Sequence, residues 1–244
     1  MKLRLFAAAA LLIAVAAPVA QAASPANALP VPKIDVSTAE AGKTETAVLA
    51  GGCFWGVQGV FEHVKGVKKV YSGYAGGPGS LAHYELVSTG TTGHAESVKI
   101  IFDPAEISYG EILRIFFTVA TDPTQVNMQF PDEGPQYRGE IFYSTPDQQR
   151  VAEAYIKQLN DAHVYRKPIA TRVDPLKGFF NAEDHHQDYL VRHPENPYIP
   201  AYDIPKVVAL RQVFPDRYVA QPTLVFPTEQ EAKAARPAKA AKTS

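Results

Sequence analysis

The alternation of strand-like and helix-like segments between residues 45 and 218 is the feature that most limits how this chain can fold. Residues 46–50 form a short apolar run that stops at Gly51 and Gly52, as a buried strand does at a turn. Residues 53–64 then carry apolar side chains at helical spacing. The pattern predicts a strand that turns through two glycines directly into a helix.

Further strands are predicted downstream of this unit. Residues 67–74 are typical of an extended segment, and residues 97–103 alternate apolar and polar side chains. Residues 139–144 have the composition of another strand, and residues 167–173 are a further candidate.

Two helix starts can be recognised from their capping residues. Ser108 and Glu111 form a capping box for a helix that runs to about residue 120, and Thr145 with Pro146 begins another helix. The order strand, helix, strand, strand, helix, strand is that of a split βαβ unit. It predicts an α+β fold, a ferredoxin-like two-layer α/β plait with an irregular C-terminal extension.

The N-terminus has the pattern of an export signal. Lys2 and Arg4 precede an apolar run at residues 5–19, and the small residues of Ala-Gln-Ala at 20–22 fit a cleavage site. A retained membrane anchor is the alternative, but the run is short for a bilayer span. We therefore expect residues 1–22 to be a signal peptide, with a periplasmic or secreted destination and no stable membrane insertion after cleavage.

The remaining ends are low in apolar periodicity. Residues 23–44 are rich in Ala, Pro and Ser, which predicts a flexible linker. Residues 219–244 end in Ala, Lys, Pro and Glu with little to bury, which predicts a disordered tail. Residues 45–218 are then the folded domain. Its partners are not expected to include nucleic acid, because the formal net charge is −1 and no basic face stands out.

Cys53 is the only cysteine of the chain. A lone cysteine can be a small buried hydrophobe. Here, however, it follows a strand and two glycines and opens a helix, where free N–H groups and the helix dipole favour a thiolate. We expect a reactive thiol with a lowered pKa. Phe54 and Trp55 directly follow it, and they could give an apolar slot for a methyl or thioether group.

Seven short motifs in order carry a family resemblance. They are GGCFWG at 51–56, GYAGG at 73–77, YELV at 84–87, GTTGHAE at 90–96, DPT at 122–124, DEGPQYR at 132–138 and EDHHQDY at 183–189. The chain resembles the A-type peptide methionine sulfoxide reductases over about residues 46–205. The last motif is similar to a C-terminal helix of that family.

The resemblance implies a thiol mechanism. The Cys53 thiolate would attack the sulfoxide sulfur of methionine-S-sulfoxide in oxidised proteins or peptides, leaving methionine and a sulfenic acid. Glu96 maps onto the acid, which would need a pKa raised by burial. No metal or organic cofactor is implied. Because no second cysteine is present, an external thiol such as a thioredoxin-like protein would have to reduce the sulfenic acid.

The other site residues follow from the same resemblance. Tyr84 and Tyr137 map onto hydroxyl donors to the developing oxyanion, and Asp132 onto a partner in that polar cluster. Phe54 and Trp55 map onto the pocket for the substrate S-methyl group. From composition alone, tyrosines are more often packing residues and an aspartate in a Pro-Asp-Glu-Gly segment serves a turn.

The chain departs from the family pattern in three places. Thr121 replaces a usual histidine, Phe130-Pro131 replaces Gly-Asn, and Gly139 replaces a common serine. The second change could shift the loop that carries Asp132 and Tyr137, and with it the substrate preference or rate.

Two other functions stay open at this point. A cysteine hydrolase would pair Cys53 with His94 or His185. A non-catalytic module would use the glycine-rich loop and the aromatics to bind a ligand. A zinc site at His185 and His186 is not expected, because adjacent histidines on a helix point apart and no further ligands join them.

Overall fold

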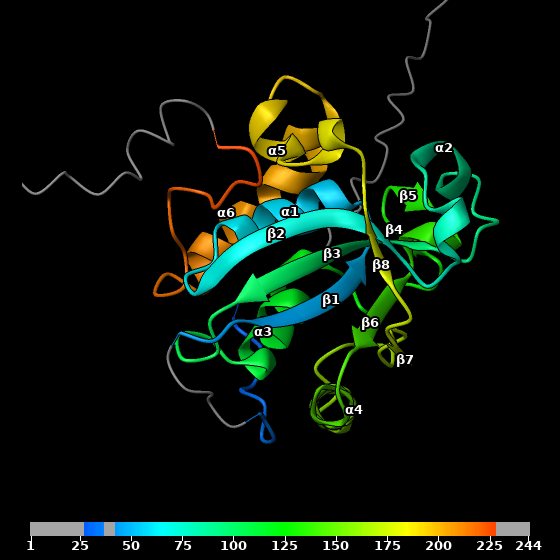
Figure 1. The fold of residues 1–244 in the computed structure, drawn as a ribbon. Coiled ribbons are helices and arrows are strands. Elements are labelled where there is room, and N and C mark those ends of the chain that lie inside the picture. The colour runs from blue at the N-terminus through cyan, green and yellow to red at the C-terminus, as the bar shows by residue number, and fades with distance from the viewer. Residues whose placement is uncertain (1–26, 37–41, 228–244) are drawn as a thin grey trace, which may run out of the picture.

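The computed structural model describes residues 27–36 and 42–227, and it has a mixed α/β fold (Figure 1). The strands are β1 (Glu45–Gly51), β2 (Val67–Ala75), β3 (Ala95–Phe102), β4 (Met128–Gln129), β5 (Asp132–Glu133), β6 (Gly139–Tyr143), β7 (Arg172–Pro175) and β8 (Phe179–Asn181). The helices are α1 (Phe54–Glu62), α2 (Tyr84–Val87), α3 (Tyr109–Ile115), α4 (Pro146–Asp161), α5 (Tyr189–Arg192) and α6 (Ile204–Val213). Short helical turns are η1 (Gly79–Leu81), η2 (Phe116–Ala120), η3 (Pro135–Tyr137), η4 (Asp184–His186) and η5 (Ile199–Asp203).

The main sheet has six strands in the order β7-β6-β1-β3-β2-β8. Every neighbouring pair is antiparallel except β6 with β7, which is parallel. β4 and β5 form a separate two-stranded pair. β1, which leads through Gly52 to Cys53, lies between β6 and β3, so the thiol follows directly after an inner strand of the sheet.

The two faces of the sheet are covered differently. Ala47 and Leu49 of β1 face the large core that α1, α3 and α4 complete, whereas Val48 and Ala50 face a small cluster on the other side. This alternation is the two-residue period of a strand. Behind α1 lie α5 and α6, which form a further layer over it (Figure 1).

The helix starts agree with their capping signals. The Ser108 side chain accepts a hydrogen bond from Glu111 N–H at 3.1 Å, and Thr145 accepts one from Gln148 N–H at 3.2 Å. The candidate strand at 167–173 forms later in the chain, as β7. The segment 183–189 is not one helix: η4 ends, and Asp188 adopts a left-handed backbone with φ 56° before α5 begins.

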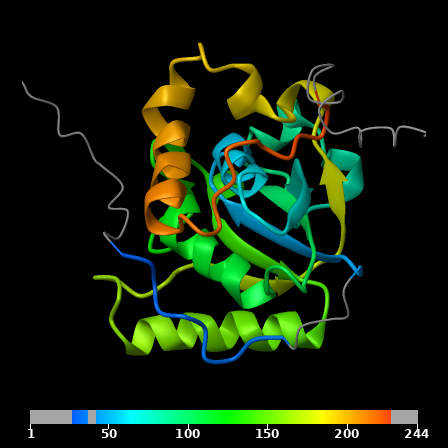
Figure 2. The ribbon, with the colours of Figure 1, turned by 90° about the vertical axis from the view of Figure 1, so that its left-hand side faces the viewer.

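Residues 27–36, which the sequence assigns to a linker, lie along α4 and α3 (Figure 2). The Tyr155 hydroxyl donates to Pro30 O at 2.8 Å, and Gly110 N–H donates to the Asp35 carboxylate at 2.8 Å. Leu29 is buried in the main core. The packed part of the chain therefore begins before residue 45.

The segment after residue 218 also makes contacts, up to residue 227. Val219 N–H donates to His63 O and Thr223 N–H to Glu62 O, both at 2.9 Å. The buried Asp188 carboxylate accepts from Val225 N–H at 2.8 Å and from Phe226 N–H at 2.9 Å. These bonds hold the first part of the predicted tail against α1 and α5. The rest of that tail, and the predicted signal peptide, lie outside the described residues.

No helix in the described ranges is long and apolar enough to cross a membrane.

Replacing Leu29 with Ala tests whether the N-terminal segment is part of the folded domain. Leu29 is 4% exposed, so we expect Leu29→Ala to lower the free energy of unfolding by about 2–3 kcal/mol. Val31, 63% exposed in the same segment, is the matched control, and Val31→Ala should change it by less than about 0.5 kcal/mol. Urea denaturation of the wild type and the two variants measures these free energies of unfolding. Equal midpoints for all three would show that this segment adds no stability.

Candidate active site

The turn between β1 and α1 places Cys53 at the start of the helix, in the N-cap position. Gly52 has φ +96°, a conformation that favours glycine, and a Cβ atom built on it would lie 2.5 Å from Cβ of Gln129. The Gln129 side chain is itself held by Asp122, whose N–H donates to its Oε1 at 3.0 Å. The two glycines therefore allow a sharp turn under a close-packed neighbouring loop.

The thiol lies in an environment that disfavours its charged form. Cys53 is 8% exposed, and burial raises its pKa well above the ordinary value, with Glu96 and Asp203 adding to the rise. The backbone N–H of Trp55 and the Lys206 ammonium act in the opposite direction, but more weakly. The expectation of a lowered pKa in the resting protein is therefore wrong, because burial among acids outweighs the helix N-terminus.

Glu96 lies on β3 and its carboxylate is buried beside the first turn of α1. Its Oε2 accepts a hydrogen bond from Phe54 N–H at 3.0 Å. Burial raises its pKa to about 8, assisted by the carboxylates of Asp132 and Asp203. At neutral pH the carboxyl group is therefore protonated, which is the condition that an acid at this position has to meet.

Tyr84, Tyr137 and Asp132 come to the same place from three separate segments: the start of α2, the end of η3 and β5. All three are half-buried, and the two tyrosines interact electrostatically with both Glu96 and Cys53. Burial is the main cause that raises the pKa of each tyrosine, so both hydroxyls keep their protons at neutral pH. The structure thus brings together all five polar residues that the sequence singled out.

The two aromatics after Cys53 have different surroundings. Phe54 is fully buried, and its ring packs against Tyr74 and His186 with centroids 5.8 and 5.3 Å apart. Trp55 is half-buried and stacks on Tyr189, with centroids 3.7 Å apart and planes 7° from parallel. Of the two, Trp55 is the ring that can meet a bound molecule, whereas Phe54 supports the cluster from within.

Sequence reasoning did not single out His186 as a site residue. Its Nδ1 accepts a hydrogen bond from Trp55 Nε1 at 3.2 Å, and its ring lies 4.4 Å from that of Tyr84. Burial lowers its pKa to about 4, so the ring is neutral. The second histidine of the pair, His185, is exposed. Within the described residues no group of three or more His, Cys, Asp or Glu could hold a metal ion.

Three more residues reach the site from the C-terminal part of the chain. The Tyr198 hydroxyl donates to the Asp132 carboxylate, and its ring meets Trp55 edge-on at 6.0 Å. Asp203 is fully buried, and its Oδ1 accepts from Lys206 Nζ at 3.2 Å, while Oδ2 has no partner among the described residues. A Cβ atom on Gly56 would lie 2.0 Å from Asp203 Oδ1, so this carboxylate abuts the first turn of α1.

A hydrolase would need a histidine base beside the thiol, and the two candidate histidines contact other groups. Both ring nitrogens of His94 face the main chain of the segment after β2: Gly77 N–H donates to Nδ1 at 3.2 Å, and Nε2 lies 3.0 Å from Pro78 O. The other candidate, His185, is exposed, and its ring lies 4.2 Å from that of His186 with the planes tilted by 43°.

The three departures from the family pattern fit the local packing. Thr121 lies against Gly51, where a Cβ atom would be 3.2 Å from Thr121 Cβ. Gly139 begins β6 opposite Gly51, and a Cβ atom on Gly139 would lie 3.0 Å from Thr171 Oγ1. A serine at position 139 would therefore be tightly packed against Thr171. The Phe130–Pro131 peptide is cis, and the loop still carries Asp132 and Tyr137 to the site.

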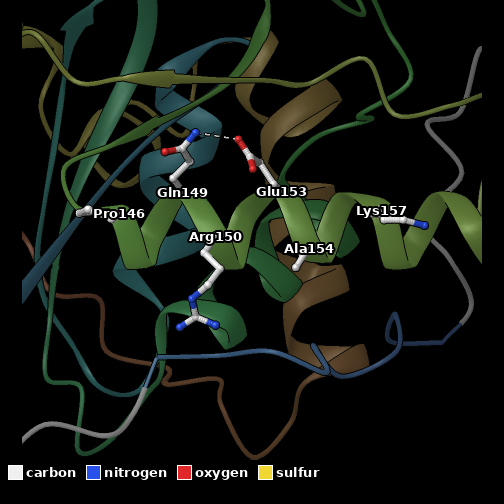
Figure 3. Close-up of a pocket in the computed structure, with 6 residues that line it drawn as sticks. All are labelled: Pro146, Gln149, Arg150, Glu153, Ala154 and Lys157. Carbon is white, nitrogen blue, oxygen red and sulfur yellow. Dashed lines mark hydrogen bonds between the residues drawn. The ribbon is translucent and has the colours of Figure 1, made fainter.

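A separate hollow of about 410 Å³ lies on the outer face of α4. Its lining residues are Pro146, Gln149, Arg150, Glu153, Ala154 and Lys157 (Figure 3). None of the residues around Cys53 contributes to it.

The fold and the site define a thiol enzyme, and comparison with known proteins gives its family. Residues 45–218 match the family model described as peptide methionine sulfoxide reductase. The chain is 53% identical to peptide methionine sulfoxide reductase MsrA 2 of Mesorhizobium japonicum, over 75% of this chain and 94% of that protein. It is 50% identical to the MsrA 2 of Synechocystis sp., over 79% and 91%.

A solved structure agrees with these sequence matches. Methionine sulfoxide reductase A of Corynebacterium diphtheriae is 33% identical, with a TM-score of 0.54 over 70% of this chain and 85% of that one. The chain belongs to the peptide methionine sulfoxide reductase family. Its activity is the thiol-dependent reduction of methionine sulfoxide, and the hydrolase and ligand-binding alternatives find no support among these relatives.

The charges around Cys53 give a prediction for the resting thiol. Because Asp203 raises the pKa of Cys53 and Lys206 lowers it, Asp203→Asn should move the thiol titration to lower pH and Lys206→Met to higher pH. Thiolate absorbance against pH, with Cys53→Ser subtracted as the background, measures both. Lys157→Met, on the exposed face of α4, is the control and should leave the midpoint unchanged. A wild-type midpoint below about 8.5, the ordinary thiol value, would contradict the buried environment.

Proposed function

We propose that Cys53 is the nucleophile and Glu96 the proton donor in the reduction of methionine-S-sulfoxide. The observation that carries the proposal is the buried Glu96 carboxyl. Its pKa is about 8, and it binds the N–H of Phe54, the residue directly after the thiol. A protonated acid is thus fixed beside the only thiol of the chain.

The chemistry balances without a cofactor. The Cys53 sulfur attacks the sulfoxide sulfur, and the Glu96 proton passes to the sulfoxide oxygen. The oxygen then passes from the substrate sulfur to the Cys53 sulfur, and both the S–O bond of the substrate and the S–S bond formed by the attack break. This leaves methionine and a Cys53 sulfenic acid, and the thiol proton replaces the one that Glu96 gave. Methionine sulfoxide is reduced by two electrons and Cys53 is oxidised by two.

The remaining site residues support this transfer. Tyr84 and Tyr137 keep their hydroxyl protons and interact with both reacting groups, so they can donate to the oxygen as its charge grows. Asp132, tied to the Tyr198 hydroxyl, can receive a polar group of the substrate. Trp55, backed by Phe54, offers an aromatic surface for the S-methyl group.

Replacing Glu96 tests the proton donor. We expect Glu96→Gln to slow sulfenic acid formation about a hundredfold, and Glu96→Asp to slow it less, because only the aspartate retains a proton to give. The wild-type rate should also fall as pH rises through about 8, where Glu96 loses its proton, and this fall should be absent in Glu96→Gln. Single-turnover kinetics measures both. A Gln variant within about threefold of wild type would remove Glu96 from this role.

We further propose that a dithiol protein of thioredoxin type recycles the enzyme. Cys53 has no partner cysteine in the chain, so the sulfenic acid has to be resolved by a thiol from another molecule. That thiol forms a mixed disulfide with Cys53 and releases water. The second thiol of the dithiol then frees the enzyme.

Turnover without a reductant tests both the reaction and the recycling. With a methionine sulfoxide peptide alone, each chain should reduce one substrate and gain one oxygen on Cys53, because nothing is present to resolve the sulfenic acid. Added dithiothreitol should give continuous loss of oxygen from the peptide. Mass analysis follows the oxygen gained by the enzyme and the oxygen lost by the peptide. The Cys53→Ser variant should neither gain oxygen nor reduce the peptide. Repeated turnover with no added thiol would refute external recycling.

We also propose that β1, α1, β2, β3, α3 and β6 form a ferredoxin-like plait, with the other elements as additions. The antiparallel order β6-β1-β3-β2 supports it. For the whole protein, the basic and apolar N-terminal sequence supports cleavage of residues 1–22 after export, and a periplasmic or secreted place of action.

A further inference from the structure

A row of aromatic rings leads from the site to the protein surface. Trp55 meets Tyr198 edge-on at 6.0 Å, Tyr198 lies 4.9 Å from Tyr202, and Tyr202 meets Phe130 at 5.9 Å between ring centroids. These are the distances of favourable aromatic pairs. The row joins the helix that carries the thiol to η5 and to the loop before Asp132.

The outer end of this row is an exposed hydrophobic ring. Phe130 is 47% exposed, and Tyr202 beside it is partly exposed. Phe130 is held in place, because its N–H donates to Gln125 Oε1 at 2.8 Å and the neighbouring Gln129 is clamped to Asp122. The position is also one of the three where the chain departs from the family pattern.

We propose that Phe130 and Tyr202 bind an apolar side chain of the substrate peptide, two to four residues from the methionine sulfoxide. The proposal rests on the proposed function, since it takes the sulfoxide to lie between Cys53 and Trp55. An extended peptide advances about 3.3 Å per residue, so a side chain two to four positions away reaches about 7–13 Å along the row.

The occupant follows from continuity with the site. The same row begins at the ring offered to the S-methyl group, and a peptide that places its sulfoxide there extends outward over Tyr198 and Tyr202. Methionine is most often buried among other apolar residues, so an apolar neighbour is common in the segments that this enzyme has to repair. A flat aromatic surface accepts Leu, Ile, Val and Phe without selecting one of them.

The test compares substrates in single turnover, without any reductant. One peptide series carries a single methionine sulfoxide in a Gly-Ser background, with one leucine moved through positions one to four on either side. N-acetylmethionine sulfoxide, which cannot reach Phe130, is the small reference substrate. The enzymes are wild type, Phe130→Ser, Tyr202→Ala and the control Phe226→Ser, an exposed phenylalanine that packs by Arg192 outside the row.

The wild-type enzyme should prefer a peptide with leucine two to four positions from the sulfoxide about five- to tenfold over the unsubstituted peptide, a typical gain from one apolar contact. Phe130→Ser and Tyr202→Ala should each remove most of this preference and change the N-acetylmethionine sulfoxide rate less than twofold. The Phe226→Ser enzyme should keep the preference.

Three results would overturn the proposal. The first is a preference that survives in both row variants. The second is an equal fall with every substrate, which would assign Phe130 to holding the loop. The third is that the row variants keep the leucine preference but show an altered KM for a thioredoxin-like reductant in multiple turnover. That result would assign Phe130 and Tyr202 to binding the reductant. Failure of the wild type on every substrate, the peptides included, would instead reject the proposed function itself.

Discussion

The hydrogen bond between Phe54 N–H and the Glu96 carboxyl joins the first turn of α1 to β3, and the site is arranged around it. Ionising a carboxyl group as buried as this one is costly, so Glu96 stays neutral at the physiological pH of most compartments. Asp132 and Asp203 add negative charge nearby, and Lys206 is the cation that offsets it at Cys53. The site therefore keeps a proton on Glu96, which would otherwise be charged, and further disfavours the Cys53 thiolate.

Two side chains, Arg138 and Glu183, hold the residues around Cys53 and Glu96 in place. Each forms hydrogen bonds between segments that are far apart in sequence. Arg138, next to Tyr137, donates to Gly93 O at 3.0 Å and to His94 O at 3.2 Å, just ahead of Glu96. Glu183 accepts from Tyr84 N–H at 3.0 Å and from the Tyr74 hydroxyl at 2.8 Å. The motifs recognised in the sequence thus include residues that hold the segments of the site in place, as well as the residues that we propose to react.

Local signals in the sequence predicted the elements that carry the thiol. The apolar run before Gly51, the helical stripe after Cys53 and the caps at Ser108 and Thr145 all begin the expected elements. The helix predicted over residues 53–64 ends at Glu62, and the one predicted to about residue 120 ends at Ile115 and continues as η2. These depend on neighbours in the chain. The roles of Asp203 and Lys206 could not be found in this way, because they reach α1 through the packing of η5 and α6, and nothing near residue 53 encodes that contact.

The difference between local and long-range contacts also explains why the pKa of Cys53 was predicted wrongly. A helix N-terminus is a local feature that the sequence reveals, whereas the burial and the acids that outweigh it arise only when β3, η5 and α6 assemble. A thiol kept protonated reacts slowly with disulfides and general oxidants, because the thiolate is the reactive form. For a chain with a single cysteine this matters, since no second thiol can rescue it from a wrong reaction. In the mechanism that we propose, a sulfoxide that enters beside the protonated Glu96 finds both the nucleophile and the proton in place, so reactivity is tied to the presence of the substrate.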